Sequence, residues 1–291
     1  IDDYNNLGVM WHPDMDEKFY SYVCDVLARH GAGIPSLVNY DVIYKTELRS
    51  GVTEEDAADV CYSGCQWYCI PGREYCDQDT NAVVLIDPMN RAIDNAIGMS
   101  CDSFEQLYAE FEKELKRTCN ILREFKDAQY NVIDSVWPEI VTSLNCHTTI
   151  ERGLDITAHR GVDYQFTSAN ILGIPNVCDS FFAIKKLVFE KNVYTLEEVR
   201  DAVKTNWQNK EPMRQRFLHE HKYGNDYDDV DEMYVRITET IANIMDNMTN
   251  NRGQQYRASL FQFQGHTASE IIGATPDGRL SSEPLAHGCN P

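Results

Sequence analysis

Two short segments of this 291-residue chain carry most of the information about its fold: Gly273-Ala274-Thr275-Pro276-Asp277-Gly278-Arg279 and, roughly two hundred residues upstream, Gly64-Cys65. In the first, Pro276 fixes a backbone φ angle, and Asp277 and Gly278 favour a tight turn. Arg279 adds a fork of hydrogen-bond donors. These features predict a structural turn. The second segment places a cysteine beside a glycine, where the backbone can approach a neighbouring group closely.

Composition excludes several classes of protein. A net charge of −20 argues against nucleic-acid binding, which needs a basic face. No apolar run reaches the roughly 20 residues of a membrane helix, and the first residues, Ile1-Asp2-Asp3-Tyr4, do not resemble a signal peptide. Ten cysteines are too sparse at this length for a disulfide scaffold, so reduced thiols are expected. We therefore expect a cytoplasmic protein with no membrane partner.

The chain alternates helical patterns with short apolar runs, which predicts an α/β fold in one compact domain over residues 1–291. Hydrophobic content of 43% allows a sizeable core. The acidic segment 223–232 lacks the glycine and glutamate positions of a calcium loop and predicts a solvated loop followed by a helix. The pattern predicts helices over 16–30 and 103–127, and the first of them has Phe19, Val23, Val26 and Leu27 on one face. It predicts strands over 34–39 and 82–86. Further helices are expected to start at Thr53 and at the capping box Thr195/Glu198.

The segment between Cys61 and Cys76 holds four cysteines in sixteen residues, and several interpretations are open. Zinc and iron–sulfur sites usually pair cysteines at closer spacing and need a second pair, so we expect no metal. A nucleophilic thiolate needs a nearby base or cation, and Arg73 is the nearest cation in the sequence. Inert buried thiols are a third interpretation. The fourth is a neutral thiol at a loop tip in a dry pocket, with Trp67 and Tyr68 excluding water from Cys65.

Several segments in collinear order resemble the glycyl radical enzymes, the family of pyruvate formate-lyase and the glycerol and diol dehydratases. The resemblance covers nearly the whole chain, but the family's C-terminal glycine radical motif does not occur before Pro291, so we interpret the chain as a core fragment. Beyond the two opening segments, the resemblance rests on residues 30–36, 39–43, 51–57, 160–167, 179–189 and 222–226.

The resemblance implies a fold and a chemistry. The fold would be part of a ten-stranded α/β barrel of two antiparallel five-stranded halves, surrounded by helices, without the glycine radical domain. Cys65 would carry a thiyl radical that abstracts hydrogen from a small organic substrate. No cofactor would be bound; a glycyl radical, on a segment absent here, would be installed by a radical S-adenosylmethionine activating enzyme. The complete enzyme would be a homodimer.

The segment also departs from the family pattern. The glycerol dehydratase-like branch has Gly-Cys-Val-Glu-Pro, whose glutamate is a general base; here Gln66 and Trp67 follow Cys65. Pyruvate formate-lyase has adjacent cysteines, which this chain lacks. The leading hypothesis is an elimination reaction of the dehydratase or lyase type. One alternative is C–C cleavage, as in a formate acetyltransferase or decarboxylase. The other is a barrel fragment that has no catalytic activity. Candidate base or pocket residues are Glu74, Asp79, Trp67, Tyr68, Tyr164 and Phe261.

Overall fold

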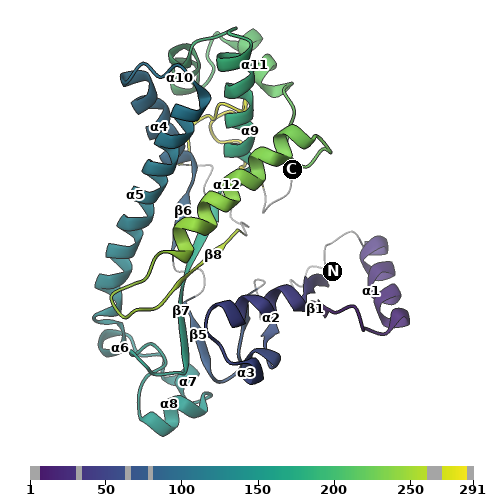
Figure 1. The fold of residues 1–291 in the computed structure, drawn as a ribbon, viewed down its shortest axis with the longest axis vertical. Helices are drawn as coiled ribbons and strands as arrows, with labels where there is room; N and C mark the ends of the chain where they lie inside the picture. Colours follow the sequence, from purple (N-terminus) through teal and green to yellow (C-terminus); the bar gives the residue numbers. More distant parts are fainter. Residues whose placement is uncertain (1–6, 31–34, 63–66, 78–80, 261–270, 287–291) are drawn as a thin grey trace. The chain divides into compact units, whose positions relative to one another are not determined.

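The structure, a computed structural model, describes residues 7–30, 35–62, 67–77, 81–260 and 271–286 (Figure 1). The chain divides into two compact units. The first comprises residues 1–78 and 129–166, and the second comprises residues 79–128 and 167–291. Helices and strands alternate in both, which confirms the predicted α/β class.

The first unit contains short strands covered by short helices. Strands β1 and β2 pair in parallel, while β3 and β4 form an antiparallel hairpin. Strand β5 pairs in parallel with the first three residues of β7. The elements are β1 (Gly8–Trp11), α1 (Glu17–His30), β2 (Ser36–Asn39), α2 (Tyr40–Arg49), α3 (Glu54–Ala58), β3 (Cys61–Tyr62), β4 (Tyr68–Cys69), β5 (Glu74–Cys76), α6 (Ile133–Val136), α7 (Ile140–Ser143), α8 (His147–Arg152) and the start of β7 (Tyr164–Leu172).

The second unit is mainly helical around three parallel strands. Strands β6 and β8 each pair with the remaining part of β7. Parallel pairing requires a long connection between successive strands, and helices supply it here. The elements are β6 (Ala82–Val84), α4 (Ile86–Gly98), α5 (Phe104–Tyr130, which extends into the first unit), α9 (Ile174–Ile184), the π-helix η2 (Lys185–Glu190), α10 (Leu196–Lys204), α11 (Glu211–Leu218), α12 (Asp228–Asp246) and β8 (Tyr256–Ser259).

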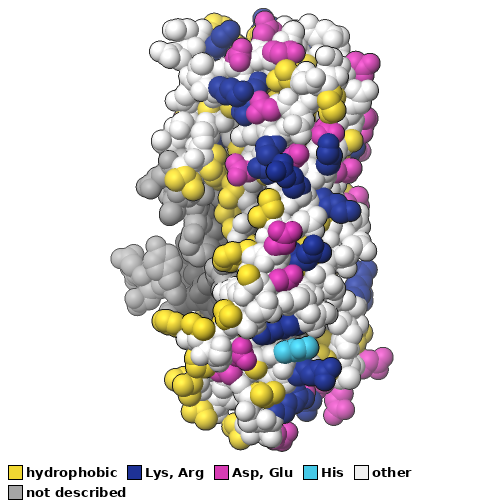
Figure 2. Space-filling view, turned by 90° about the vertical axis from the view of Figure 1, so that its left-hand side faces the viewer, with side chains coloured by type: hydrophobic (Ala, Val, Ile, Leu, Met, Phe, Trp, Pro, Cys, Tyr) yellow, Lys and Arg dark blue, Asp and Glu magenta, His cyan; other side chains and the backbone are white. Residues whose placement is uncertain are grey.

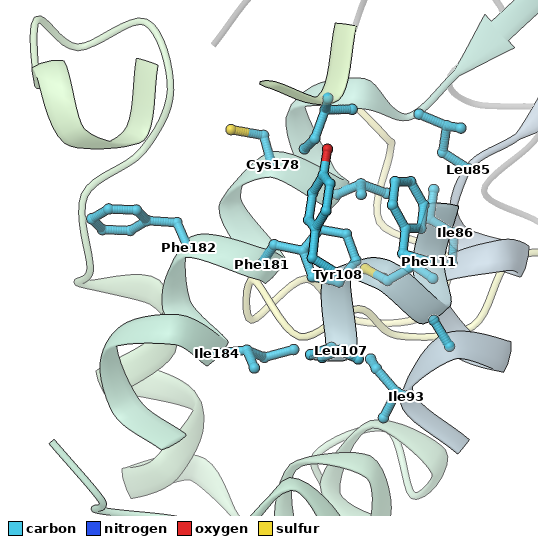
Figure 3. Packing of buried hydrophobic residues seen from close by; sticks show 14 of the residues in the cluster. Leu85, Ile86, Ile93, Leu107, Tyr108, Phe111, Cys178, Phe181, Phe182 and Ile184 are labelled. Carbon is cyan, nitrogen blue, oxygen red and sulfur yellow. The ribbon is translucent and has the colours of Figure 1, made fainter. Parts of the chain in front are cut away.

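Aromatic side chains of α5 and α9 form the centre of the second unit's core (Figure 3). The rings of Phe111 and Phe181 meet edge to face with centroids 4.9 Å apart, and Tyr108 lies 5.9 Å from Phe181. All three side chains are fully buried. Such ring pairs add to the burial of apolar area, so this contact fixes how α5 packs against α9.

Local helix signals in the sequence are confirmed. Thr53 caps α3 by accepting a hydrogen bond from the Asp56 amide, and Thr195 and Glu198 form a reciprocal capping box at α10. Ser103 accepts from the Gln106 amide at the start of α5. In the acidic segment, α12 begins at Asp228. Three acidic residues in its first turn suit the positive end of the helix dipole.

Two predictions from the apolar pattern are wrong. The strand predicted over 82–86 ends at Val84, and Ile86 already begins α4. Pro88 explains the early helix, because proline is tolerated in a first turn, where its missing N–H has no intrahelical partner. In α1, Phe19 is 48% exposed, whereas Val23 is buried. The ring of Tyr20 packs on Trp11 instead, with centroids 6.4 Å apart.

The described surface carries charges of both signs. Figure 2 shows basic and acidic side chains interspersed on one face, with scattered apolar side chains between them. Among the described residues, no helix is both long enough and apolar enough to cross a bilayer.

Candidate active site

The first part of the cysteine segment, from Cys61 to Cys69, begins and ends in the β3–β4 hairpin. Cys61 lies opposite Cys69 and Tyr62 lies opposite Tyr68 in its antiparallel register. The Cys61 and Cys69 sulfur atoms are 3.9 Å apart. Residues 63–66, which include Cys65, lie outside the described residues. The hairpin therefore brings together the two ends of the segment that carries Cys65.

The two aromatic residues that follow Cys65 differ in exposure. Trp67 is buried, with 7% of its surface exposed, while Tyr68 is half-buried in β4. Ile70, one residue after the hairpin, is also buried and joins the core of this unit. Burial of Trp67 and Ile70 in apolar surroundings thus stabilises the position of the chain just after Cys65.

Glu74 lies close to the hairpin at the start of β5. Its side chain is buried, and its carboxylate accepts a hydrogen bond of 3.0 Å from the Ile70 amide. The Ile70 carbonyl in turn accepts from the Glu74 amide at 3.1 Å. Glu74 therefore holds the turn that leads out of β4, and its carboxylate is fixed relative to the hairpin. Glu47 of α2 is a second fully buried acidic residue in this unit.

The environment of Cys69 favours the neutral thiol. Burial, with smaller contributions from the neighbouring Cys61 and Glu74, raises the pKa of Cys69 to about 12. A thiol with such a pKa is protonated near neutral pH, so Cys69 is not a resting thiolate of the kind that the nucleophilic interpretation of this segment requires. Among the described residues, no group of three His, Cys, Asp or Glu side chains could hold a metal ion.

Tyr164 begins β7 and lies in register with Glu74, but its hydroxyl points to α3. It donates a hydrogen bond of 2.7 Å to the Asp56 carboxylate and accepts from the Thr53 amide at 3.4 Å. The hydrogen bond from Tyr164 is the main cause that lowers the pKa of Asp56, and Arg73, with Nη1 3.3 Å from the carboxylate, adds to it. Tyr164 thus stabilises the N-terminus of α3. Asp79 and Phe261, the other candidates, lie outside the described residues.

The turn Asp277-Gly278-Arg279 lies in the second unit. The Asp277 carboxylate accepts a hydrogen bond of 2.8 Å from Asn176, and its amide donates to the Ser180 hydroxyl at 3.0 Å, so α9 holds the turn. Gly278 has a φ angle of +96°, and a Cβ there would lie 2.6 Å from Leu218. Both the backbone conformation and the space require glycine.

Arg279 is buried, and its side chain binds the turn from inside. The guanidinium donates to the backbone carbonyls of Gly273, Leu280 and Glu283, with distances of 3.0 Å to Leu280 and 2.6 Å to Glu283. Nε donates to the Thr275 hydroxyl at 3.2 Å. All of these acceptors belong to residues 273–283, so the Arg279 side chain stabilises the turn that contains it.

Asp179 is a titratable residue that the sequence analysis names only as part of the family resemblance. Burial raises the pKa of this carboxyl to about 7, against the opposing effects of Lys222 and of the Tyr223 amide, which donates to it at 2.9 Å. The nearby Asp277 also raises it. Because the shift comes from tertiary burial, no local motif could have predicted it.

Replacing Asp179 by asparagine is expected to stabilise the protein at alkaline pH. The folded-state pKa of about 7 is above the unfolded value, so the wild type loses stability as pH rises towards 7. The asparagine avoids this loss and retains an oxygen that can accept from Tyr223. We expect its advantage in free energy of unfolding to grow by roughly 1–2 kcal/mol between pH 5.5 and pH 8.

Urea denaturation at both pH values measures this difference. Asp201→Asn, a change to an exposed carboxylate on α10, is the control. An advantage for Asp179→Asn that is equal at both pH values, or larger at pH 5.5, would contradict the assignment.

Comparison with known proteins places this geometry in a family. Residues 4–269 match the family described as pyruvate formate lyase-like. The chain belongs to this family. Its relatives and structural neighbours are glycyl radical enzymes, which confirms the resemblance found in the sequence.

Two relatives that are dehydratases are much longer than this chain. The chain is 27% identical over 290 residues to trans-4-hydroxy-L-proline dehydratase of Clostridioides difficile, covering 94% of this chain and 36% of the relative. It is 27% identical over 285 residues to (2S)-3-sulfopropanediol dehydratase of Klebsiella oxytoca, covering 90% and 34%. The chain thus spans about a third of the length of these relatives.

A solved structure shows the same fold. The glycerol-bound B12-independent glycerol dehydratase of Clostridium butyricum superimposes with a TM-score of 0.88 at 24% identity, over 97% of this chain and 37% of that chain. At this identity the similarity supports the α/β fold of the glycyl radical enzyme barrel. The described strands form two two-stranded sheets and one four-stranded sheet and do not themselves close a ten-stranded barrel.

Proposed function

We propose that these residues are part of a glycyl radical enzyme that catalyses elimination from a small organic substrate. The family match over residues 4–269, with Gly64-Cys65 carried between the strands of the β3–β4 hairpin, is the observation that supports it most. The dehydratase relatives favour elimination. We also propose that residues 1–291 form one section of a ten-stranded barrel domain and that the complete enzyme is a homodimer.

In the proposed mechanism Cys65 transfers hydrogen in both directions. When present, the glycyl radical supplies the unpaired electron. Cys65 gives up its S–H hydrogen atom and then, as a thiyl radical, takes a hydrogen atom from a substrate C–H bond. A bond on the adjacent substrate carbon breaks, and for a hydroxyl group the oxygen takes a proton and leaves as water. Cys65 finally returns a hydrogen atom to the product radical, which regenerates its thiyl radical, and the thiol is restored when the unpaired electron goes back to the glycine.

Elimination needs a group that moves the proton, and Glu74 is our candidate. It is buried next to the hairpin and oriented by the Ile70 amide. Burial and a fixed orientation suit a general acid or base. Asp79, Tyr68 and Phe261 remain candidates for the pocket, whereas Tyr164 binds Asp56 in the described structure.

C–C cleavage is the second candidate function. Trp67 occupies the position of the glutamate of the dehydratase-like branch, and its side chain is buried. An indole cannot act as a carboxylate base. A formate acetyltransferase or decarboxylase reaction breaks a C–C bond and would not need a base at this position.

Activation of the natural polypeptide that contains these residues tests both candidates. The protein would be incubated anaerobically with a radical S-adenosylmethionine activating enzyme, S-adenosylmethionine and a reductant, and the glycyl radical measured by electron paramagnetic resonance. We expect a radical, followed by release of water from vicinal diols or hydroxylated amino acids. Carbon dioxide from arylacetates, or acetyl-CoA from pyruvate and CoA, would support C–C cleavage. A protein that forms no radical would fit a non-catalytic barrel fragment and overturn the proposal.

A further inference from the structure

Cys61 and Cys69 form a cross-strand pair of thiols. They are directly opposite each other in the antiparallel β3–β4 register, and their sulfur atoms are 3.9 Å apart. Both side chains are partly exposed, so a small reagent can reach them. This pair flanks Cys65 symmetrically in the sequence, four residues away on each side. The radical mechanism proposed above does not use either thiol.

The geometry of the hairpin suits a disulfide. Directly opposed residues in antiparallel strands have Cα atoms about 4.5–5.5 Å apart, which lies inside the range of roughly 4.4–6.8 Å found for disulfides. An S–S bond is about 2.05 Å long, so the two sulfurs must approach by about 1.9 Å. Side-chain rotation can supply this movement while the backbone register is kept.

The electrostatic environment also favours a neutral product. Glu74 and Glu47 both act on the Cys69 thiol and disfavour its thiolate. A disulfide removes the titratable thiol and leaves an uncharged group in the same place. The partly buried hairpin therefore accommodates the oxidised pair more readily than a Cys69 anion.

We propose that Cys61 and Cys69 are a two-electron redox site that reacts with low-molecular-weight disulfides. The Cys61 thiolate attacks the reagent RSSR, forming a mixed disulfide and releasing RS⁻. The released RS⁻ then takes the Cys69 proton and becomes RSH, and the Cys69 sulfur attacks the Cys61 sulfur, forming the Cys61–Cys69 bond and releasing a second RS⁻ that is protonated by water. The protein is oxidised by two electrons, and the reagent is reduced to two RSH. The product is a covalent ring that encloses residues 62–68.

Peptide mapping of the oxidised protein tests the site. The protein would be purified reduced and without oxygen, incubated with oxidised glutathione, alkylated and digested with chymotrypsin without reductant. Cleavage after Tyr62, Trp67 and Tyr68 puts Cys61, Cys65 and Cys69 in three separate peptides. We expect the Cys61–Cys69 linked peptides to exceed any linked pair containing Cys65 or Cys76 by at least tenfold. Equal or greater linkage to Cys65 or Cys76, or glutathione bound to Cys61 with no linked pair, would overturn the proposal.

Single variants separate the two steps. Cys69→Ser is expected to stop at the mixed disulfide between Cys61 and glutathione, and Cys61→Ser to lose the linked pair. Cys24→Ser, at a partly buried cysteine of α1, is the matched control and should keep the pair at the wild-type level. If a hairpin variant fails to fold, the map of the wild-type protein decides alone. The result is independent of radical formation, because no activating enzyme is present.

Discussion

Replacing Cys65 by alanine in the complete, activated enzyme is expected to lower turnover by at least roughly a thousandfold, while the glycyl radical still forms. Alanine has no S–H bond, so it can neither pass the unpaired electron on nor return hydrogen to the product. In the proposed mechanism, the activating enzyme installs the radical on another segment. Turnover and the glycyl radical signal, measured on the same sample, therefore respond differently to the change.

Two observations would make this result specific. Cys24→Ala, which removes another partly buried thiol, should leave both turnover and radical at wild-type levels. Turnover by the Cys65→Ala variant within tenfold of the wild type would remove Cys65 from the mechanism. Loss of the glycyl radical together with turnover would instead indicate a failure of activation.

Replacing Arg279 by methionine is expected to lower the free energy of unfolding by roughly 3–5 kcal/mol. Methionine fills a similar volume, but it leaves the carbonyls of Gly273, Leu280 and Glu283 without the donors that Arg279 supplies. The substitution also removes the positive charge next to Asp277, which is buried in the same turn. Urea denaturation followed by circular dichroism measures the change.

Arg117→Met is the matched control for this stability measurement. Its guanidinium is 66% exposed and lies 3.5 Å from Glu114 in an ion pair on α5. Glu114 is buried but keeps its hydrogen bond of 2.9 Å from Arg91, so loss of the exposed Arg117 should change stability by less than about 1 kcal/mol. If Arg279→Met were as mild as the control, the turn would not depend on the buried guanidinium.

Local signals in the sequence predicted the helices well. The capping residues Thr53, Ser103 and Thr195 mark helix starts that the structure contains, because capping depends on residues within one turn. The end of β6 was misjudged, since an apolar run from Val83 to Ile86 does not reveal where a strand gives way to a helix.

The sequence could not predict which residues contact one another in the candidate site, because these contacts are tertiary. The bond between Tyr164 and Asp56 joins residues 108 positions apart, and no periodicity predicts it. Likewise, the contact of Cys61 with Cys69 follows from strand register, and the pKa of Asp179 follows from burial. Residue types and spacing therefore indicated the chemistry of the cysteine segment, but could not assign partners to individual side chains.

The π-helix η2, which continues directly from α9, has a consequence for sequence comparison. A π-turn contains one residue more than the α-helical ladder around it, so η2 corresponds to a single-residue insertion between Lys185 and Glu190. A related chain without the extra residue would keep a continuous α-helix here. Its correct alignment with this chain would need a one-position gap in 185–190, without which the columns between the extra residue and the helix end at Glu190 would match side chains from different faces of the helix.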